Sequence, residues 1–117
     1  MGSMEYAGQE IQIDDRLLTH LQVVVIGKLR RGEPFLMSWV NTVSSGSGRA
    51  AIWLHPNFPV QFRFAGSRVP QINAEWVQRL RQSADSSTGL IVTGEDGWIA
   101  PIERMAPVRR ARAMQMA

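Results

Sequence analysis

The chain has 117 residues, enough for one domain with one modest hydrophobic core. No apolar run approaches the roughly 20 residues that a membrane-spanning helix needs. The chain contains no cysteine, which excludes disulfides, thiolate metal ligands and a cysteine nucleophile. The first ten residues lack the charged and apolar regions of a secretory signal, so we expect a cytoplasmic protein that does not contact a membrane.

The positive charge is concentrated near the C-terminus. The formal net charge is +3, and residues 105–117 contain three basic side chains and no acidic one, so residues 1–104 are neutral. The three are Arg109, Arg110 and Arg112. This distribution predicts a single domain over residues 1–104, followed by a basic, flexible tail over residues 105–117. An acidic partner such as nucleic acid would meet the tail more readily than the neutral body.

The first predicted elements are a strand and a helix. Polar and apolar residues alternate over residues 10–15, which predicts a strand with Ile11 and Ile13 on its buried side. Asp14 or Asp15 then caps a helix over residues 16–31, because a carboxylate accepts hydrogen bonds from the free N–H groups of the first turn. Gly32 ends this helix.

The middle of the chain predicts three strands, at residues 35–40, 49–55 and 60–64. A glycine- and serine-rich loop and a turn with two prolines separate them. Because these connections are short, we expect antiparallel neighbours. Asn73 then caps a second helix over residues 74–83, and residues 89–94 form a last strand. The fold class is therefore α+β: a two-layer sandwich in the order β-α-β-β-β-α-β, with a mostly antiparallel sheet and both helices on one face.

One face of this sheet carries large aromatic and basic side chains. Alternation along the three strands assigns one mostly apolar set to the helices: Leu36, Val40, Ile52, Leu54, Phe62 and Phe64. The opposite set forms a predicted interaction face: Met37, Trp39, Arg49, Trp53, His55, Gln61 and Arg63. Since a solvent-facing sheet surface is normally polar, this set requires an explanation. A one-residue error in register would exchange the two faces.

Three interpretations of the aromatic face stay open. The first strand or residues 97–102 cover it within the chain. Alternatively, it is the interface of a homodimer or of a complex with a protein partner, where tryptophan, methionine and arginine are enriched. In the third interpretation, its tryptophans stack on nucleic-acid bases while arginines contact phosphates.

Residues that suggest chemistry are few. His20 lies in the first helix, where a histidine is usually structural, and His55 ends a strand. Their separation lacks the spacing of a helical metal pair, so we expect no metal and no cofactor. Arg68 precedes the helix capped by Asn73, and a helix N-terminus attracts anions, so one hypothesis is an anion or phosphate site there. The alternative is a rigid loop that only carries the helix cap. His55 and Arg68 would be the residues of an enzyme site, without a nucleophile or an acid–base pair beside them.

Three strings carry a resemblance to a known family: "KLRRGEPF", "WLHP" and "GSR.P.IN", the dots standing for any residue. Over residues 10–92 the chain resembles a family of short actinobacterial proteins of unknown function, often labelled ATP-dependent DNA ligase or ligase-like protein. The resemblance implies a bacterial cytosolic protein with one α+β domain and no catalytic residues to transfer.

The ligase label implies a nucleotidyl-transferring lysine, and the sequence can be tested for it. Such ligases resemble one another in a K-x-D-G motif, whereas Lys28 is the sole lysine and is followed by Leu29, Arg30 and Arg31. We therefore interpret the label as inherited and expect a non-enzymatic module that acts through the aromatic face. A nucleic-acid-associated accessory role in DNA ligation or repair is the alternative.

Overall fold

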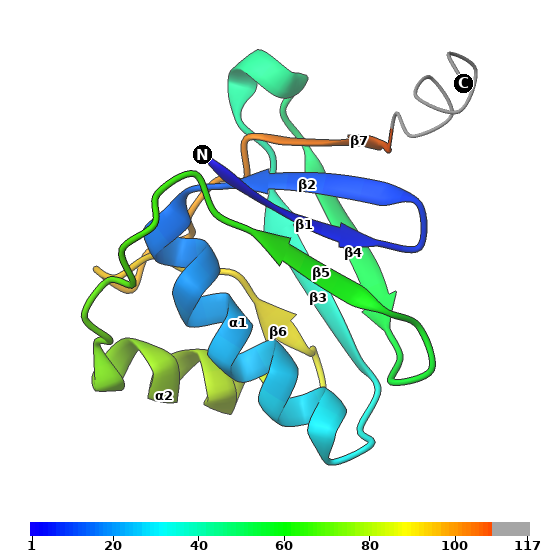
Figure 1. Cartoon of the computed structure of the whole chain (residues 1–117), viewed down its shortest axis with the longest axis vertical. Coiled ribbons are helices and arrows are strands. Elements are labelled where there is room, and N and C mark those ends of the chain that lie inside the picture. The colour runs from blue at the N-terminus through cyan, green and yellow to red at the C-terminus, as the bar shows by residue number, and fades with distance from the viewer. Residues whose placement is uncertain (109–117) are drawn as a thin grey trace.

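The computed structural model describes residues 1–108 (Figure 1). The longest connections between elements are residues 64–73 and 92–103. In chain order the elements are β1 (Gly2–Tyr6), β2 (Gln9–Ile13), α1 (Asp15–Arg30), β3 (Phe35–Val40), the 3-10 helix η1 (Val43–Ser45), β4 (Arg49–Leu54), β5 (Val60–Arg63), α2 (Ala74–Ala84), β6 (Leu90–Ile91) and β7 (Arg104–Pro107).

The strands form two sheets. Sheet A has the order β5-β1-β2-β7 and is antiparallel throughout. Sheet B has the order β4-β3-β6, with β3 antiparallel to β4 and parallel to β6. In Figure 1 the strands of sheet A run across those of sheet B, and both helices lie together on one side. The predicted α+β sandwich is confirmed, with more strands than the sequence indicated.

The N-terminal hairpin was not predicted from the sequence. Ala7 and Gly8 both have positive φ, 50° and 80°, as the two-residue turn of a tight hairpin requires. The turn aligns Met4 with Ile11, and both side chains are fully buried. At the other end of β1, a Cβ atom on Gly2 would lie 2.6 Å from the carbonyl oxygen of Arg63. β1 is therefore a tightly enclosed central strand.

The three middle strands form where the sequence predicts them, but one predicted pairing is wrong. β3 and β4 are antiparallel neighbours as expected. β5 instead pairs with β1, with Phe62 opposite Met4. The turn between β4 and β5 contains two prolines, and the His55 N–H at its start donates to the Tyr6 hydroxyl of β1, 2.8 Å away. The chain thereby crosses from sheet B to sheet A.

Both helices begin at the predicted caps. One Asp14 carboxylate oxygen accepts from the backbone N–H groups of Arg16 and Leu17. The Asn73 side-chain oxygen accepts from those of Glu75 and Trp76. These bonds satisfy donors that would otherwise lack partners in the first turn. Neither helix of the described residues is long and apolar enough to cross a membrane.

The hydrophobic core lies between the inner faces of the two sheets and the two helices. Sheet A contributes Met4 and Ile11, α1 contributes Leu21, and α2 contributes Leu80, all fully buried. The inner side chains of β3 join the same cluster. One contiguous core therefore holds both sheets together.

The predicted boundary after residue 104 falls inside a strand. β7 pairs with β2, with Met105 opposite Ile11, so sheet A includes residues that were assigned to the tail. The reason is tertiary, because this segment gains backbone partners only at the exposed edge of β2. The predicted phosphate contacts of Arg109, Arg110 and Arg112 lie outside the described residues.

Candidate interaction surface

The predicted aromatic face combined residues that lie on opposite sides of sheet B. Met37 is fully buried and Trp39 is 2 % exposed, both in the core. The register sets Phe35 opposite Leu54, so odd-numbered residues of β3 share a face with even-numbered residues of β4. The sequence-based prediction placed odd-numbered residues of β3 on the same face as odd-numbered residues of β4, which exchanges the two faces of β3. Met37 and Trp39 are therefore buried because they lie on the core side of β3, and not because another segment covers an outer face.

Trp39 is fixed by a hydrogen bond as well as by packing. Its indole Nε1 donates to the side-chain oxygen of Asn41, 3.1 Å away, so the buried N–H has a partner. The Asn41 amide in turn donates to the carbonyl oxygen of Ser47. This arrangement anchors the loop between β3 and β4 and makes Trp39 a structural residue.

The outer face of sheet B carries mostly apolar residues, and they differ from those predicted for the aromatic face. Its residues are Leu36, Ser38 and Val40 of β3, Arg49, Ala51 and Trp53 of β4, and Ile91 of β6. Leu36 lies opposite Trp53, and the two are 36 % and 57 % exposed. Ile91 is 38 % exposed, and the neighbouring Ile99 is 55 % exposed. Leu36, Ile91 and Ile99 line a hollow of about 660 Å³, and Trp53 lies outside its lining.

The charge on this face is sparse. Arg49, at the start of β4, is exposed, and the residues named above include no acid. Arg49 lies opposite Val40, so its guanidinium stands at the rim of the apolar set. Arg49 and Trp53 lie at opposite ends of β4, and both residue types are enriched at protein interfaces.

Gln61 and Arg63 lie on the other sheet. They belong to β5, opposite Glu5 and Ser3 of β1, on the outer face of sheet A. Glu10 and Gln12 of β2 occupy the same face. This face is polar, so the two residues do not extend the apolar surface that contains Trp53.

His55 is a turn residue. Its Nδ1 accepts from the Asn57 N–H, 3.1 Å away, and its ring meets Phe58 edge to face. Arg68 is exposed and lies beyond the opposite end of β5. The structure therefore does not bring together the enzyme site predicted from these two residues. Among residues 1–108, no cluster of three histidine or carboxylate side chains could hold a metal ion.

The N-terminus of α2 is occupied by the protein's own groups. The Asn73 side-chain nitrogen donates to Glu95 at 2.9 Å, and Arg16 Nε donates to the same carboxylate at 2.9 Å. The Arg16 guanidinium, followed by Asn73, lowers the pKa of Glu95 to about 2. The predicted anion site near Arg68 and Asn73 therefore already contains a carboxylate.

His20 is buried and structural. Its ring stacks on Trp76 at 4.2 Å between centroids. Nδ1 lies 2.7 Å from the Arg16 carbonyl oxygen, and Nε2 accepts from the Asn73 N–H at 2.9 Å, an arrangement that fits a neutral ring with its proton on Nδ1. His20 thus joins the starts of the two helices.

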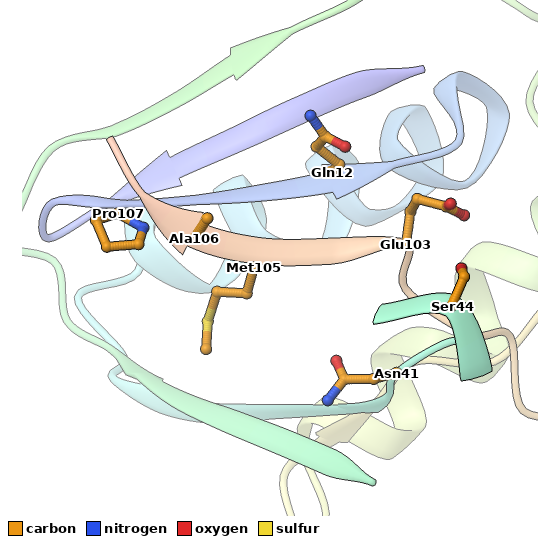
Figure 2. A pocket seen from close by; sticks show the side chains of 7 residues that line it. All are labelled: Gln12, Asn41, Ser44, Glu103, Met105, Ala106 and Pro107. Carbon is orange, nitrogen blue, oxygen red and sulfur yellow. The ribbon is translucent and has the colours of Figure 1, made fainter. Parts of the chain in front are cut away.

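A second hollow of about 510 Å³ lies beside β7 (Figure 2). Its lining is mixed: Gln12, Asn41, Ser44, Glu103, Met105, Ala106 and Pro107. Figure 2 shows Met105 reaching into the space next to β7 while Gln12 points to the other side. Asn41 is committed to Trp39 and Ser47, so this hollow lacks a convergent set of uncommitted polar groups. No pattern in the sequence indicated it.

Comparison with known proteins gives one finding. The family model described as a domain of unknown function, DUF7882, matches residues 1–95. No curated protein and no solved structure matches the chain. The matched range includes sheet B, both helices and all of sheet A except β7. The chain therefore belongs to the DUF7882 family.

Proposed function

We propose that this domain is a small non-enzymatic interaction module that associates with a protein surface, either a second copy or another protein, through the outer face of sheet B. The composition of that face supports the proposal. Single exposed apolar residues are normal, whereas a contiguous set that lines one hollow is typical of an interaction surface. Leu36, Ile91 and Ile99 are exposed and line the hollow, and the exposed Trp53 lies opposite Leu36.

A nucleic-acid role, including the DNA-related role that the ligase label suggests, has less support. Base-stacking sheets present several aromatic rings on one face. With Trp39 in the core, Trp53 is the aromatic residue left among those on the outer face of sheet B. An oligonucleotide complex that weakens steeply with salt and is lost in Trp53→Ser would favour this role instead.

Co-purification tests the proposed function. Tagged wild type, Trp53→Arg and the control Val69→Arg are expressed in the source cell. Val69 is more exposed than Trp53 but lies in the loop before α2, away from the hollow. We expect the wild type and the control to retain a stoichiometric protein partner that Trp53→Arg loses. Equal recovery by all three, with each variant folded, contradicts the proposal.

A further inference from the structure

β4 is the least protected edge strand among the described residues. It has six residues, against four in β5, two in β6 and four in β7. It contains no proline and no lysine, the residues that commonly guard an edge, while β7 ends in proline and β5 follows one. In Figure 1, β3 separates β4 from β6, which leaves the far side of β4 as the border of sheet B.

The outward backbone groups of β4 can be identified from the neighbouring strands. The carbonyls of Ser38 and Val40 accept from Val92 and Ile102, so even-numbered residues of β3 face away from β4. Odd-numbered residues of β3 therefore bond the β4 residues opposite them, which are Ala50, Ile52 and Leu54. The N–H and C=O groups of Arg49, Ala51 and Trp53 consequently point outward from the sheet edge.

Burial along β4 is incomplete on its inner side as well. Ala50 and Ile52 face the core but are only partly buried, whereas Phe35, Met37 and Trp39 of β3 are buried. An added strand would complete the covering of both residues. An added strand at this edge would therefore pair with the backbone of β4 and pack against its inner side chains.

The sequence of β4 is complementary to itself in one antiparallel register. We propose that two copies of this chain pair through β4, with the two-fold axis at Ala51. Arg49 then lies opposite Trp53 of the partner subunit, on the outer face, and Ala51 meets its own counterpart. An arginine over an indole is attractive, and the small side chain at the axis avoids a clash. This inference goes beyond the proposed function, because the pairing uses the edge of sheet B and leaves its outer face open to a further partner.

The competing register is less favourable. An axis at Ile52 would place Arg49 opposite His55 and would require the His55 N–H as a donor. That N–H already donates to Tyr6 at 2.8 Å. With the axis at Ala51, every outward N–H and C=O of Arg49, Ala51 and Trp53 finds a partner within the two strands.

The dimer would also bring two exposed apolar ends together. Val43 in η1 precedes β4 and Phe58 follows it, and both are exposed. Antiparallel pairing places the η1 end of each copy beside the Phe58 end of the partner. The two copies of sheet B would then form one continuous sheet with an enlarged apolar outer face.

Cysteine cross-linking tests the geometry directly, because the chain has no cysteine of its own. Residues opposite each other in an antiparallel pair have Cβ atoms about 4.5–5.5 Å apart. Purified Ala51→Cys should therefore give a two-chain product with a short thiol-reactive cross-linker, much faster than the exposed control Val69→Cys. Cross-linking no faster than in the control overturns the proposal.

A residue exchange tests the register. Trp53→Arg places arginine opposite arginine and should weaken the dimer about tenfold or more in sedimentation equilibrium. Adding Arg49→Trp restores the opposed arginine and tryptophan and should recover most of the affinity. A double variant as weak as the single one contradicts the register, and a monomeric wild type contradicts the dimer.

The variant Ile91→Lys distinguishes a dimer paired along the edge of β4 from a dimer that associates through the outer face of sheet B. Ile91 lies on the outer face of β6, across the sheet from β4. We expect this variant to remain dimeric, whereas a face-to-face dimer would dissociate and overturn the edge pairing. Suppose that Ala51→Cys gives no cross-linked dimer, while a different protein binds the wild type and not Trp53→Arg. This result would support the proposed function and refute pairing with a second copy of the chain.

Discussion

The outer faces of the two sheets differ in chemistry although both belong to short, mostly antiparallel sheets over one core. The outer face of sheet A presents Glu5, Glu10, Gln12, Gln61 and Arg63, with Ser3 buried among them. The outer face of sheet B presents Leu36, Val40, Ala51, Trp53 and Ile91, with Ser38 and Arg49 as its polar residues. A sheet face that only meets water needs polar residues. The difference is the basis for our proposal that sheet B, and not sheet A, carries the interaction surface.

Mutations on the two sides of sheet B should differ most in the stability that they cost. Trp39→Ala should reduce the free energy of unfolding by about 3–5 kcal/mol, because it leaves a cavity in the core. Trp53→Ala should cost about 1 kcal/mol or less in the monomer, because that side chain is 57 % exposed. Urea unfolding of both variants measures the difference. Equal losses would mean that the faces are assigned wrongly.

A second comparison contrasts the enclosed centre of sheet A with the open edge of sheet B. Gly2→Ala places a carbon 2.6 Å from the Arg63 carbonyl oxygen, and should destabilise the domain by about 1–3 kcal/mol. Ala51→Val enlarges an exposed side chain on β4 and should change stability by about 0.5 kcal/mol or less. Thermal unfolding followed by circular dichroism tests both. A harmless Gly2→Ala would contradict the tight enclosure of β1.

The outer faces of the two sheets should also differ in how well they bind an apolar dye. Replacing Leu36 and Ile91 together by serine should lower the fluorescence of an apolar dye bound to the protein roughly twofold, because the hollow loses its apolar lining. Gln61→Ser on sheet A is the matched control and should leave the signal unchanged. If the control lowers the signal as much, the dye does not distinguish the faces and the contrast fails.

The smallest effect lies away from both faces and depends on pH. The pKa of Glu95 is lowered from 4.5 to about 2, chiefly by Arg16, so its contribution to stability is complete above about pH 4.5 and disappears as the pH falls through about 2. Glu95→Gln should therefore be less stable than the wild type near neutral pH, with the difference vanishing in acid. Urea midpoints from pH 2 to 7 measure it. A difference that grows in acid would contradict this sign.

Local signals in the sequence predicted most of the elements. The N-cap residues Asp14 and Asn73 predicted the starts of the two helices. The alternation of polar and apolar residues predicted β3, β4 and β5. The first hairpin also had a signal, since Met4 and Tyr6 alternate with polar residues ahead of Ala7 and Gly8. That alternation could have been recognised before the structure.

Pairing between distant strands was not predictable in the same way. The eight-residue connection from β3 to β4 does not fix a register, so the sequence could not decide whether Trp39 or Leu36 shares a face with Trp53. The transfer of β5 to β1 depends on a contact with Tyr6, far away in the sequence. Trp53 and Arg49 are exposed, as the predicted face requires, whereas Met37 and Trp39 are buried in the core.

Site-specific photo-cross-linking in the source cell tests whether the outer face of sheet B meets another protein. A photoreactive amino acid replaces Ala51 on β4 or Gln61 on β5, both exposed outer-face positions on edge strands of the two sheets. We expect discrete protein adducts from position 51 and few or none from position 61. Adducts of equal yield from both positions, or none from position 51, would contradict the assignment of the outer face of sheet B as the interaction surface.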